Sequence, residues 1–319
     1  MLDIAVTPCY YVTTLKREIR KPRKQNQSLM AQKEQFIMSK KIIALVLAVL
    51  VAAIGFVFVA CNGNEEPSTS APADSSDTSA AAADSDLEYV KNKGKLVVGI
   101  TEFEPMDYKD KESGKWIGFD ADLATAFAKE LGVEVEFVEI VWDNKIIDLN
   151  GKNIDCVWNG MTLTDDVKAA METSKAYCNN AQVVVLPADK VDSVKTVEDC
   201  KKLNFAVENG SAGKKMAEAN GFKFTEVLTQ ADALSEVASG TSDAAIIDSL
   251  MAGAMVGEGT GFATLKTTDI KLNSEEYGVG FRKGSELAAK LNDFFAKSLE
   301  DGSMEKLAET YGVQEALIK

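Results

Sequence analysis

An uncharged apolar run from Ile42 to Ala60 divides this 319-residue chain before any globular fold can be assigned. Lys40 and Lys41 precede the run and Cys61 follows it, an order typical of a secretory signal. The run is also long enough to span a bilayer, so an uncleaved anchor helix is the alternative. Residues 1–60 hold nine Lys or Arg and three Asp or Glu, whereas the rest of the chain holds 26 and 46. This asymmetry predicts that the acidic part lies outside the membrane.

The tetrapeptide Phe58–Cys61 (FVAC) resembles a bacterial lipobox, in which the cysteine is acylated and becomes the mature N-terminus. Phe58 stands where a leucine is usual. Cys61 can also be interpreted as a cysteine that merely ends a membrane helix, but we favour lipidation. In either case the acidic body is expected to be extracytoplasmic and tethered to the cell membrane.

The segments on both sides of the signal have separate interpretations. Residues 1–37 form a basic extension, which we interpret as the result of a start codon placed too early, with Met38 as the initiator. Residues 62–86 are rich in Ser, Ala and Asp and have almost no large apolar side chain, which predicts a flexible stalk. We therefore expect a signal or anchor over 1–60 and a lipidated cysteine with its stalk over 61–86.

Composition excludes several classes of function. The chain has no histidine, which rules out Ser-His-Asp catalysis and histidine-bound zinc. Its acidic body would repel phosphate backbones, so nucleic acid is not an expected partner. No CxxC or other metal-binding spacing occurs, and neither a metal nor a cofactor is expected.

From Leu87 onward, apolar strand patterns alternate with helical patterns, which predicts an α/β fold with mostly parallel sheets. Leu123, Phe127 and Leu131 form one helical stripe, and Leu287 begins another. The clearest expected strands are 95–101, 133–140, 154–161, 182–186, 204–207 and 244–247. In open α/β sheets, ligands bind beyond the carboxyl ends of the strands. The loops to inspect therefore start at Thr101, Trp142, Asn159, Glu208 and Asp248.

Several short stretches, in this order and spacing, carry a family resemblance. They are KLVVGIT (95–101), GFDADL (118–123), NGMTLTD (159–165), AVENGS (206–211), SDAAIID (242–248) and YGVGFRKG (277–284). Residues 87–313 resemble the extracellular solute-binding proteins of ABC importers, in the amino-acid family that includes glutamine- and histidine-binding proteins. The resemblance implies a type II periplasmic-binding-protein-like fold, with two mostly parallel sheets, one in each lobe, joined by a two-strand hinge. It places lobe one at 87–184 plus 278–319 and lobe two at 185–277.

The resemblance also implies a set of ligand contacts. Asp248 would hold the ligand's α-ammonium, Gly160 would offer a carbonyl, and Thr162 a hydroxyl. The helix that starts at Ser211 and Ala212 would present N–H groups to an anion. Phe103 and Trp142 would be aromatic walls, with Trp142 expected to be the more exposed. The full expected set is Thr101, Phe103, Trp142, Gly160, Thr162, Glu208, Ser211, Ala212 and Asp248.

Purely structural interpretations remain open beside these roles. Asp248 can cap the helix that follows it, Ser211 can cap its own helix, and Thr162 can be an ordinary loop threonine. Either aromatic wall can equally belong to the core. Trp158 lies within a strand, and we assign it to packing.

The chain departs from the family at one position. Val167 stands where an arginine would pair with the ligand's α-carboxylate. Either Thr162 and the Ser211 helix bind the carboxylate alone, or Lys168 substitutes, or the ligand is not a standard α-amino acid. Glu208 and Asp248 without that arginine predict a cationic ligand, such as a basic amino acid or another amine. The competing interpretation is that Glu208 turns outward or pairs with a lysine.

We therefore expect a monomeric, non-enzymatic binding protein that delivers a polar or cationic amino acid, or a related amine, to an ABC permease in the membrane. A cyclohexadienyl-dehydratase-like enzyme, with Asp248 and Glu208 as acid and base, and a sensor domain are the alternatives. The family places the segments of Cys156 and Cys178 near each other, which makes a disulfide between them possible; buried thiols, with Cys200, are the alternative.

Overall fold

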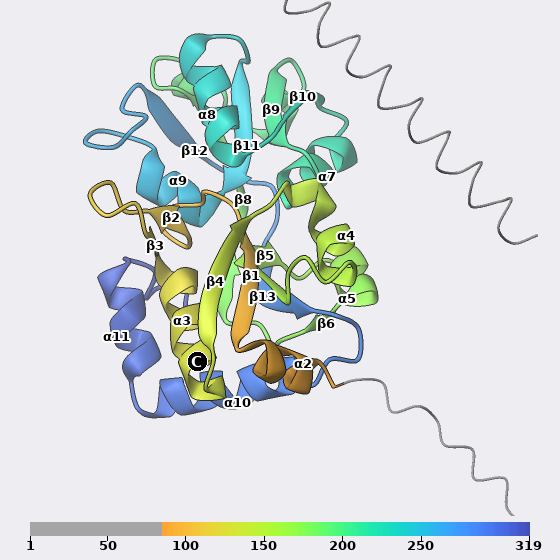
Figure 1. Ribbon diagram of the computed structural model, residues 1–319. Coiled ribbons are helices and arrows are strands. Elements are labelled where there is room, and N and C mark those ends of the chain that lie inside the picture. Colours follow the sequence, from red (N-terminus) through yellow and green to blue (C-terminus); the bar gives the residue numbers. More distant parts are fainter. Residues whose placement is uncertain (1–84) are drawn as a thin grey trace, which may run out of the picture. The chain divides into compact units, whose positions relative to one another are not determined.

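The computed structural model describes residues 85–319, drawn in colour in Figure 1. The expected signal or anchor, Cys61 and nearly all of the expected stalk lie outside the described residues. Among residues 85–319, no helix is long and apolar enough to cross a membrane.

The first sheet has the strand order β4-β1-β5-β13-β6, and β7 also pairs with β13. Only β13 runs against the others, because β1 is parallel to β4 and β5, whereas β5, β6 and β7 each pair antiparallel with β13. The strands are β1 (Lys95–Ile100), β4 (Glu134–Glu139), β5 (Cys156–Thr162), β6 (Glu172–Thr173), β7 (Cys178–Asn180) and β13 (Glu275–Phe281).

The second sheet has the order β10-β9-β11-β8-β12, and here only β8 is reversed. The expectation of mostly parallel sheets is therefore confirmed, with one reversed strand in each. Its strands are β8 (Gln182–Pro187), β9 (Asn204–Glu208), β10 (Lys223–Val227), β11 (Ala244–Asp248) and β12 (Leu265–Lys271); a separate pair is β2 (Tyr108–Lys109) and β3 (Trp116–Ile117).

Helices connect the strands, and side-chain or glycine caps mark several of their ends. Thr164 accepts a hydrogen bond from the Val167 N–H at the start of α5, and Gly132 ends α3 in the left-handed conformation. The helices are α2 (Asp86–Lys93), α3 (Phe119–Leu131), α4 (Lys145–Asn150), α5 (Asp165–Ala170), α6 (Val197–Cys200), α7 (Ala212–Ala219), α8 (Gln230–Ser239), α9 (Ser249–Met255), α10 (Leu287–Glu300) and α11 (Ser303–Thr310), with short 3₁₀ turns at Trp142–Asn144 and Val191–Ser193.

The chain crosses between the sheets twice, from β7 into β8 and from β12 into β13. The two crossing segments run side by side, because Asn180 is the register partner of Glu275 and the Leu272 N–H donates to the Gln182 carbonyl. We call the part that holds the first sheet the first lobe and residues 182–273 the second lobe. The crossings thus lie a few residues before the limits expected at 184/185 and 277/278.

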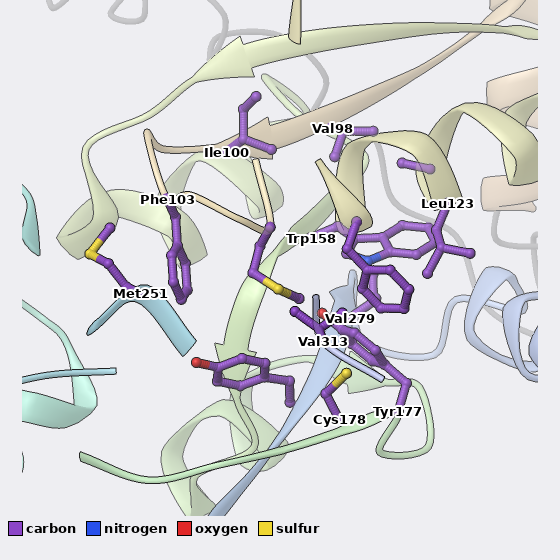
Figure 2. Close-up of a cluster of buried hydrophobic side chains, with 14 of the residues drawn as sticks. Val98, Ile100, Phe103, Leu123, Trp158, Tyr177, Cys178, Met251, Val279 and Val313 are labelled. Atoms are coloured by element: carbon purple, nitrogen blue, oxygen red, sulfur yellow. The ribbon is translucent and has the colours of Figure 1, made fainter. Parts of the chain in front are cut away.

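An apolar core extends through both lobes. One cluster includes Ile100, Trp158 and Phe281 of the first sheet and Val185 and Met251 of the second lobe. Figure 2 labels Trp158, Phe103 and Met251 in this cluster. Trp158 is fully buried and makes edge contacts with Phe127 and Phe295, so its assignment to packing is confirmed.

The possible disulfide between Cys156 and Cys178 is wrong, because both thiols are free and buried. Cys156 is the register partner of Phe281 on one side of β13, whereas Cys178 pairs with Tyr277 on the other side. Since neighbouring strands lie about 4.8 Å apart, two strand spacings and the offset along β13 exceed the roughly 7 Å Cα separation that a disulfide tolerates.

The buried thiols should therefore resist alkylation in the native protein. Burial raises the pKa of Cys156 and Cys178 well above the ordinary range and that of Cys200 to about 11, so little thiolate forms at neutral pH. We expect peptide mass spectrometry to find all three unmodified after iodoacetamide treatment, and all three modified when guanidinium chloride is added first. Labelling of Cys156 without denaturant would contradict this.

Candidate functional site

A cavity of about 230 Å³ lies between the two lobes, beyond the carboxyl ends of β1, β9 and β11. Pockets for drug-sized ligands have volumes of about 300–1,000 Å³, so this smaller cavity suits a ligand of amino-acid size. Every expected ligand-contact residue of the body lines it, namely Thr101, Phe103, Trp142, Gly160, Thr162, Glu208, Ser211, Ala212 and Asp248.

Asp248 is the most heavily hydrogen-bonded carboxylate of the cavity. Its Oδ1 accepts bonds from Asn180 Nδ2, from Gln182 Nε2 at 2.8 Å and from the Tyr277 hydroxyl at 2.9 Å. Its Oδ2 accepts one bond, from Gln230 Nε2, among residues 85–319, so a lone pair remains for a further donor. Burial, and next the charge of Glu275, raise the pKa of Asp248 to about 7. The side chain occupies the cap position of α9 but makes no capping bond, so the capping role is wrong.

Glu208 ends β9 and is only 3% exposed. Burial and the neighbouring charge of Asp248 raise the pKa of Glu208 to about 8, although the charge of Lys145 opposes that shift. Within the described part of the chain, no lysine or arginine nitrogen comes within ion-pairing distance of Glu208. The competing interpretation, that it turns outward or forms a lysine pair, is therefore wrong, and the cavity holds a buried carboxylate that lacks an ion-pair partner among residues 85–319.

Lys145, at the start of α4, was not expected in the site. Its Nζ donates to the carbonyls of Trp142 and Gly210, at 3.1 Å each, and lies 4.6 Å from the centre of the Trp142 ring. Burial lowers the pKa of Lys145 to about 8, against the opposing charges of Glu208 and Asp143. Because Gly210 belongs to the second lobe, this lysine also joins the lobes.

Further contacts join the lobes at the cavity. Lys215 of α7 forms an ion pair with Asp166 of α5, and Asn209 Nδ2 donates to Asp143 Oδ2 at 3.2 Å. Lys215, Asp166 and Asp143 also line the cavity. The two lobes are thus closed around the cavity, and each lobe contributes residues to its lining.

Gly160 and Phe103 occupy adjoining positions in the wall. Gly160 has a φ of +53°, and a Cβ atom there would lie 2.5 Å from Phe103 Cε1, so only glycine fits. Its N–H donates to Asp120 Oδ2 at 2.7 Å, which orients the peptide. Phe103 and Trp142 are 3% and 8% exposed, so both aromatic walls are buried and Trp142 is only slightly more open.

The hydroxyl groups of the site already have protein partners. Thr101 Oγ1 donates to Asn159 Oδ1 at 2.6 Å, and Thr162 Oγ1 donates to Glu275 Oε1 at 3.0 Å. Ser211 Oγ accepts from the Lys214 N–H at 3.1 Å, so the capping role of this serine is confirmed. Ala212, the first residue of α7, also lines the cavity, and the first N–H groups of a helix have no partner within it.

Lys168 does not fill the position of the missing arginine. It is exposed and does not line the cavity, whereas Val167 is buried and does. Sequence reasoning also missed Gln230, whose amide and carbonyl both bind Asp248. The only signal for Gln230 was its place after Thr229, which begins a capping box at the start of α8.

The comparisons with known proteins agree with this geometry. The family model for bacterial extracellular solute-binding proteins, family 3, matches residues 96–314. The chain therefore belongs to this family of extracellular solute-binding proteins.

Its relatives bind amino acids. The arginine-binding extracellular protein ArtP of Bacillus subtilis (strain 168) is 30% identical over 224 residues, 69% of this chain and 86% of ArtP. A probable histidine-binding protein of Neisseria gonorrhoeae is 32% identical over 236 residues, 70% of this chain and 85% of that protein. An ancestral arginine-binding protein, solved with arginine bound, is 36% identical with a TM-score of 0.63, covering 68% of this chain and 98% of that one. The expected α/β, two-lobed fold and amino-acid-binding family are confirmed.

Proposed function

We propose that this protein binds a basic amino acid, or a closely related amine, in the cavity between its lobes and delivers it to an ABC permease. The single observation that carries the proposal is the pair of buried carboxylates, Glu208 and Asp248, in one cavity. Glu208 has no ion-pair partner among residues 85–319, and a buried carboxylate is stabilised when a cation enters beside it.

The arrangement of Asp248 supports binding of an ammonium group. Its Oδ2 accepts one hydrogen bond among the described residues, and Gly160 and Thr162 line the same cavity. The second carboxylate, on Glu208, would then neutralise a cationic side chain. A ligand with two cationic groups and one carboxylate fits this distribution, which makes arginine the first probe to test.

The location and the tether belong to the same proposal. Membership of an extracellular family supports an extracytoplasmic location, and the tetrapeptide Phe58–Cys61 supports attachment through a lipid on Cys61. The protein would act without catalysis, as a monomer, since a cavity that closes by lobe contacts needs no second subunit and no reacting group. The named relatives are binding proteins, which also favours this function over an enzymatic one.

Calorimetric titration with arginine, lysine, histidine, glutamine, glutamate and leucine tests the proposal. We expect basic amino acids to bind most tightly. Because burial raises the pKa of Asp248 to about 7 and of Glu208 to about 8, both must lose protons when a cation binds. Affinity for arginine should therefore rise on the order of tenfold or more from pH 6 to pH 8. Preference for glutamate or leucine would overturn the proposal.

A further inference from the structure

Val167 leaves α5 without a cation for the ligand's carboxylate. The valine is buried, lines the cavity and can offer neither charge nor a side-chain hydrogen bond. Its backbone N–H is already bonded to Thr164 Oγ1, at 3.3 Å. A counter-ion for a carboxylate at this end of the cavity must therefore come from another part of the wall.

Lys215 reaches this place from the second lobe. Its Nζ lies 3.5 Å from Thr164 Oγ1, the same hydroxyl that binds the Val167 N–H, and it forms an ion pair with Asp166. The side chains of Lys215 and Asp166 are 40% and 81% exposed, so their pair is a weak, solvent-screened one. The ammonium carries three donor hydrogens, and it can bind a second anion while it keeps Asp166.

Lys145, the other lysine of the cavity, is less suited to this role. Its ammonium already donates to two carbonyls and packs over Trp142. Burial is the main cause that lowers the pKa of Lys145, and the charge of Lys215 lowers it further. The two ammonium groups therefore repel each other, and an anionic ligand group near them would relieve that repulsion.

We propose that Lys215 is a specificity-determining residue that binds the ligand's α-carboxylate from the second lobe, in place of an arginine on α5. This inference rests on the proposed function, because it concerns the same cavity and an amino-acid ligand. Lys215 reaches α5 only when the lobes are together, so the carboxylate is bound fully only in the closed form. The ligand's charge thus contributes directly to closure.

The test compares an amino acid with its α-amide, which lacks the carboxylate charge. L-Arginine with L-argininamide, and L-histidine with L-histidinamide, would be titrated into the full-length wild type and the Lys215→Met variant. We expect Lys215→Met to weaken binding of the amino acids about 10- to 100-fold, and binding of the amides less than threefold. A role limited to joining the lobes would weaken both members of each pair equally.

Two variants serve as controls. Lys201→Met changes an exposed lysine of the second lobe, which pairs with Glu198 and does not line the cavity, and should leave both affinities within twofold. Asp166→Asn removes the ion pair but keeps Lys215, and should change the amino-acid affinity less than threefold. Equal losses for acid and amide in Lys215→Met, or no loss, would overturn this inference alone. Failure of the wild type to bind any amino acid would overturn the proposed function and this inference with it.

Discussion

Replacing Glu208 with glutamine is expected to weaken binding of arginine at pH 8 by about 100-fold or more, and at the same time to stabilise the ligand-free protein. The loss of affinity follows because removing one partner of a buried charge pair costs about 2–5 kcal/mol. Glutamine keeps the shape of the side chain, so the effect reports the charge. Calorimetric titration gives the affinity, and thermal unfolding without ligand gives the stability.

The gain in stability has a definite pH dependence. Because burial raises the pKa of Glu208 from 4.5 to about 8, the folded state binds more protons than the unfolded state between these values. The free energy of unfolding of the wild type therefore falls as pH rises through this window. At pH 7 the penalty is on the order of 3 kcal/mol, which Glu208→Gln removes, and the unfolding midpoint should rise by several degrees.

Glu226→Gln, on the exposed surface of β10, is the matched control for Glu208→Gln. It removes the same charge outside the cavity and should change both quantities little. If Glu208→Gln binds arginine as tightly as the wild type, the carboxylate of Glu208 does not contact the ligand.

Replacing Arg282 with methionine is expected to lower the free energy of unfolding by about 3–5 kcal/mol. Arg282 follows β13 and is 9% exposed. Its Nε donates to Asp86 at 2.8 Å, its Nη2 to Asp155 at 3.2 Å, and its Nη1 to the Ile154 carbonyl at 2.7 Å. Methionine fills similar space but leaves the fully buried Asp155 with Lys93 as its only ion-pair partner among residues 85–319.

Urea unfolding measures the effect of Arg282→Met, and the same protein should bind arginine with unchanged affinity, since Arg282 does not line the cavity. Lys297→Met breaks an exposed pair with Glu130 and should cost less than about 1 kcal/mol. If Arg282→Met lowers the free energy of unfolding by no more than Lys297→Met, the buried contacts of Arg282 do not stabilise the fold as predicted.

The strands and the cavity wall could be predicted from the sequence to different extents. Apolar runs such as 95–101 and 244–247 predict buried strands at almost their observed bounds. The order of the motifs carries the family resemblance, from which the two lobes were predicted. The reversed strand β13 was not predicted as antiparallel, because strand direction depends on partners far away in the chain. The pairing of Cys156 and Cys178 failed for the same reason, since they flank that strand.

The site residues that sequence reasoning missed were missed for one common reason. Lys145, Gln230 and Lys215 lie in helices, and nothing local shows that these polar side chains turn toward the cavity. Their roles depend on contacts with the other lobe or with another element, as in the bond from Lys145 to the Gly210 carbonyl. Residues at strand ends, such as Asp248, were found because the sheet itself directs them to the cavity.

The amides that hold Asp248 have a consequence for how selectivity can change during evolution. Asn180 and Gln182 flank the first crossing, and both also bind Glu275, which directly follows the second crossing. Asp248 is therefore bonded directly to residues beside a crossing between the lobes. A substitution at Asp248 would also change these contacts beside the crossing, so a change of ligand preference should arise more readily at cavity side chains away from the crossings, such as Glu208.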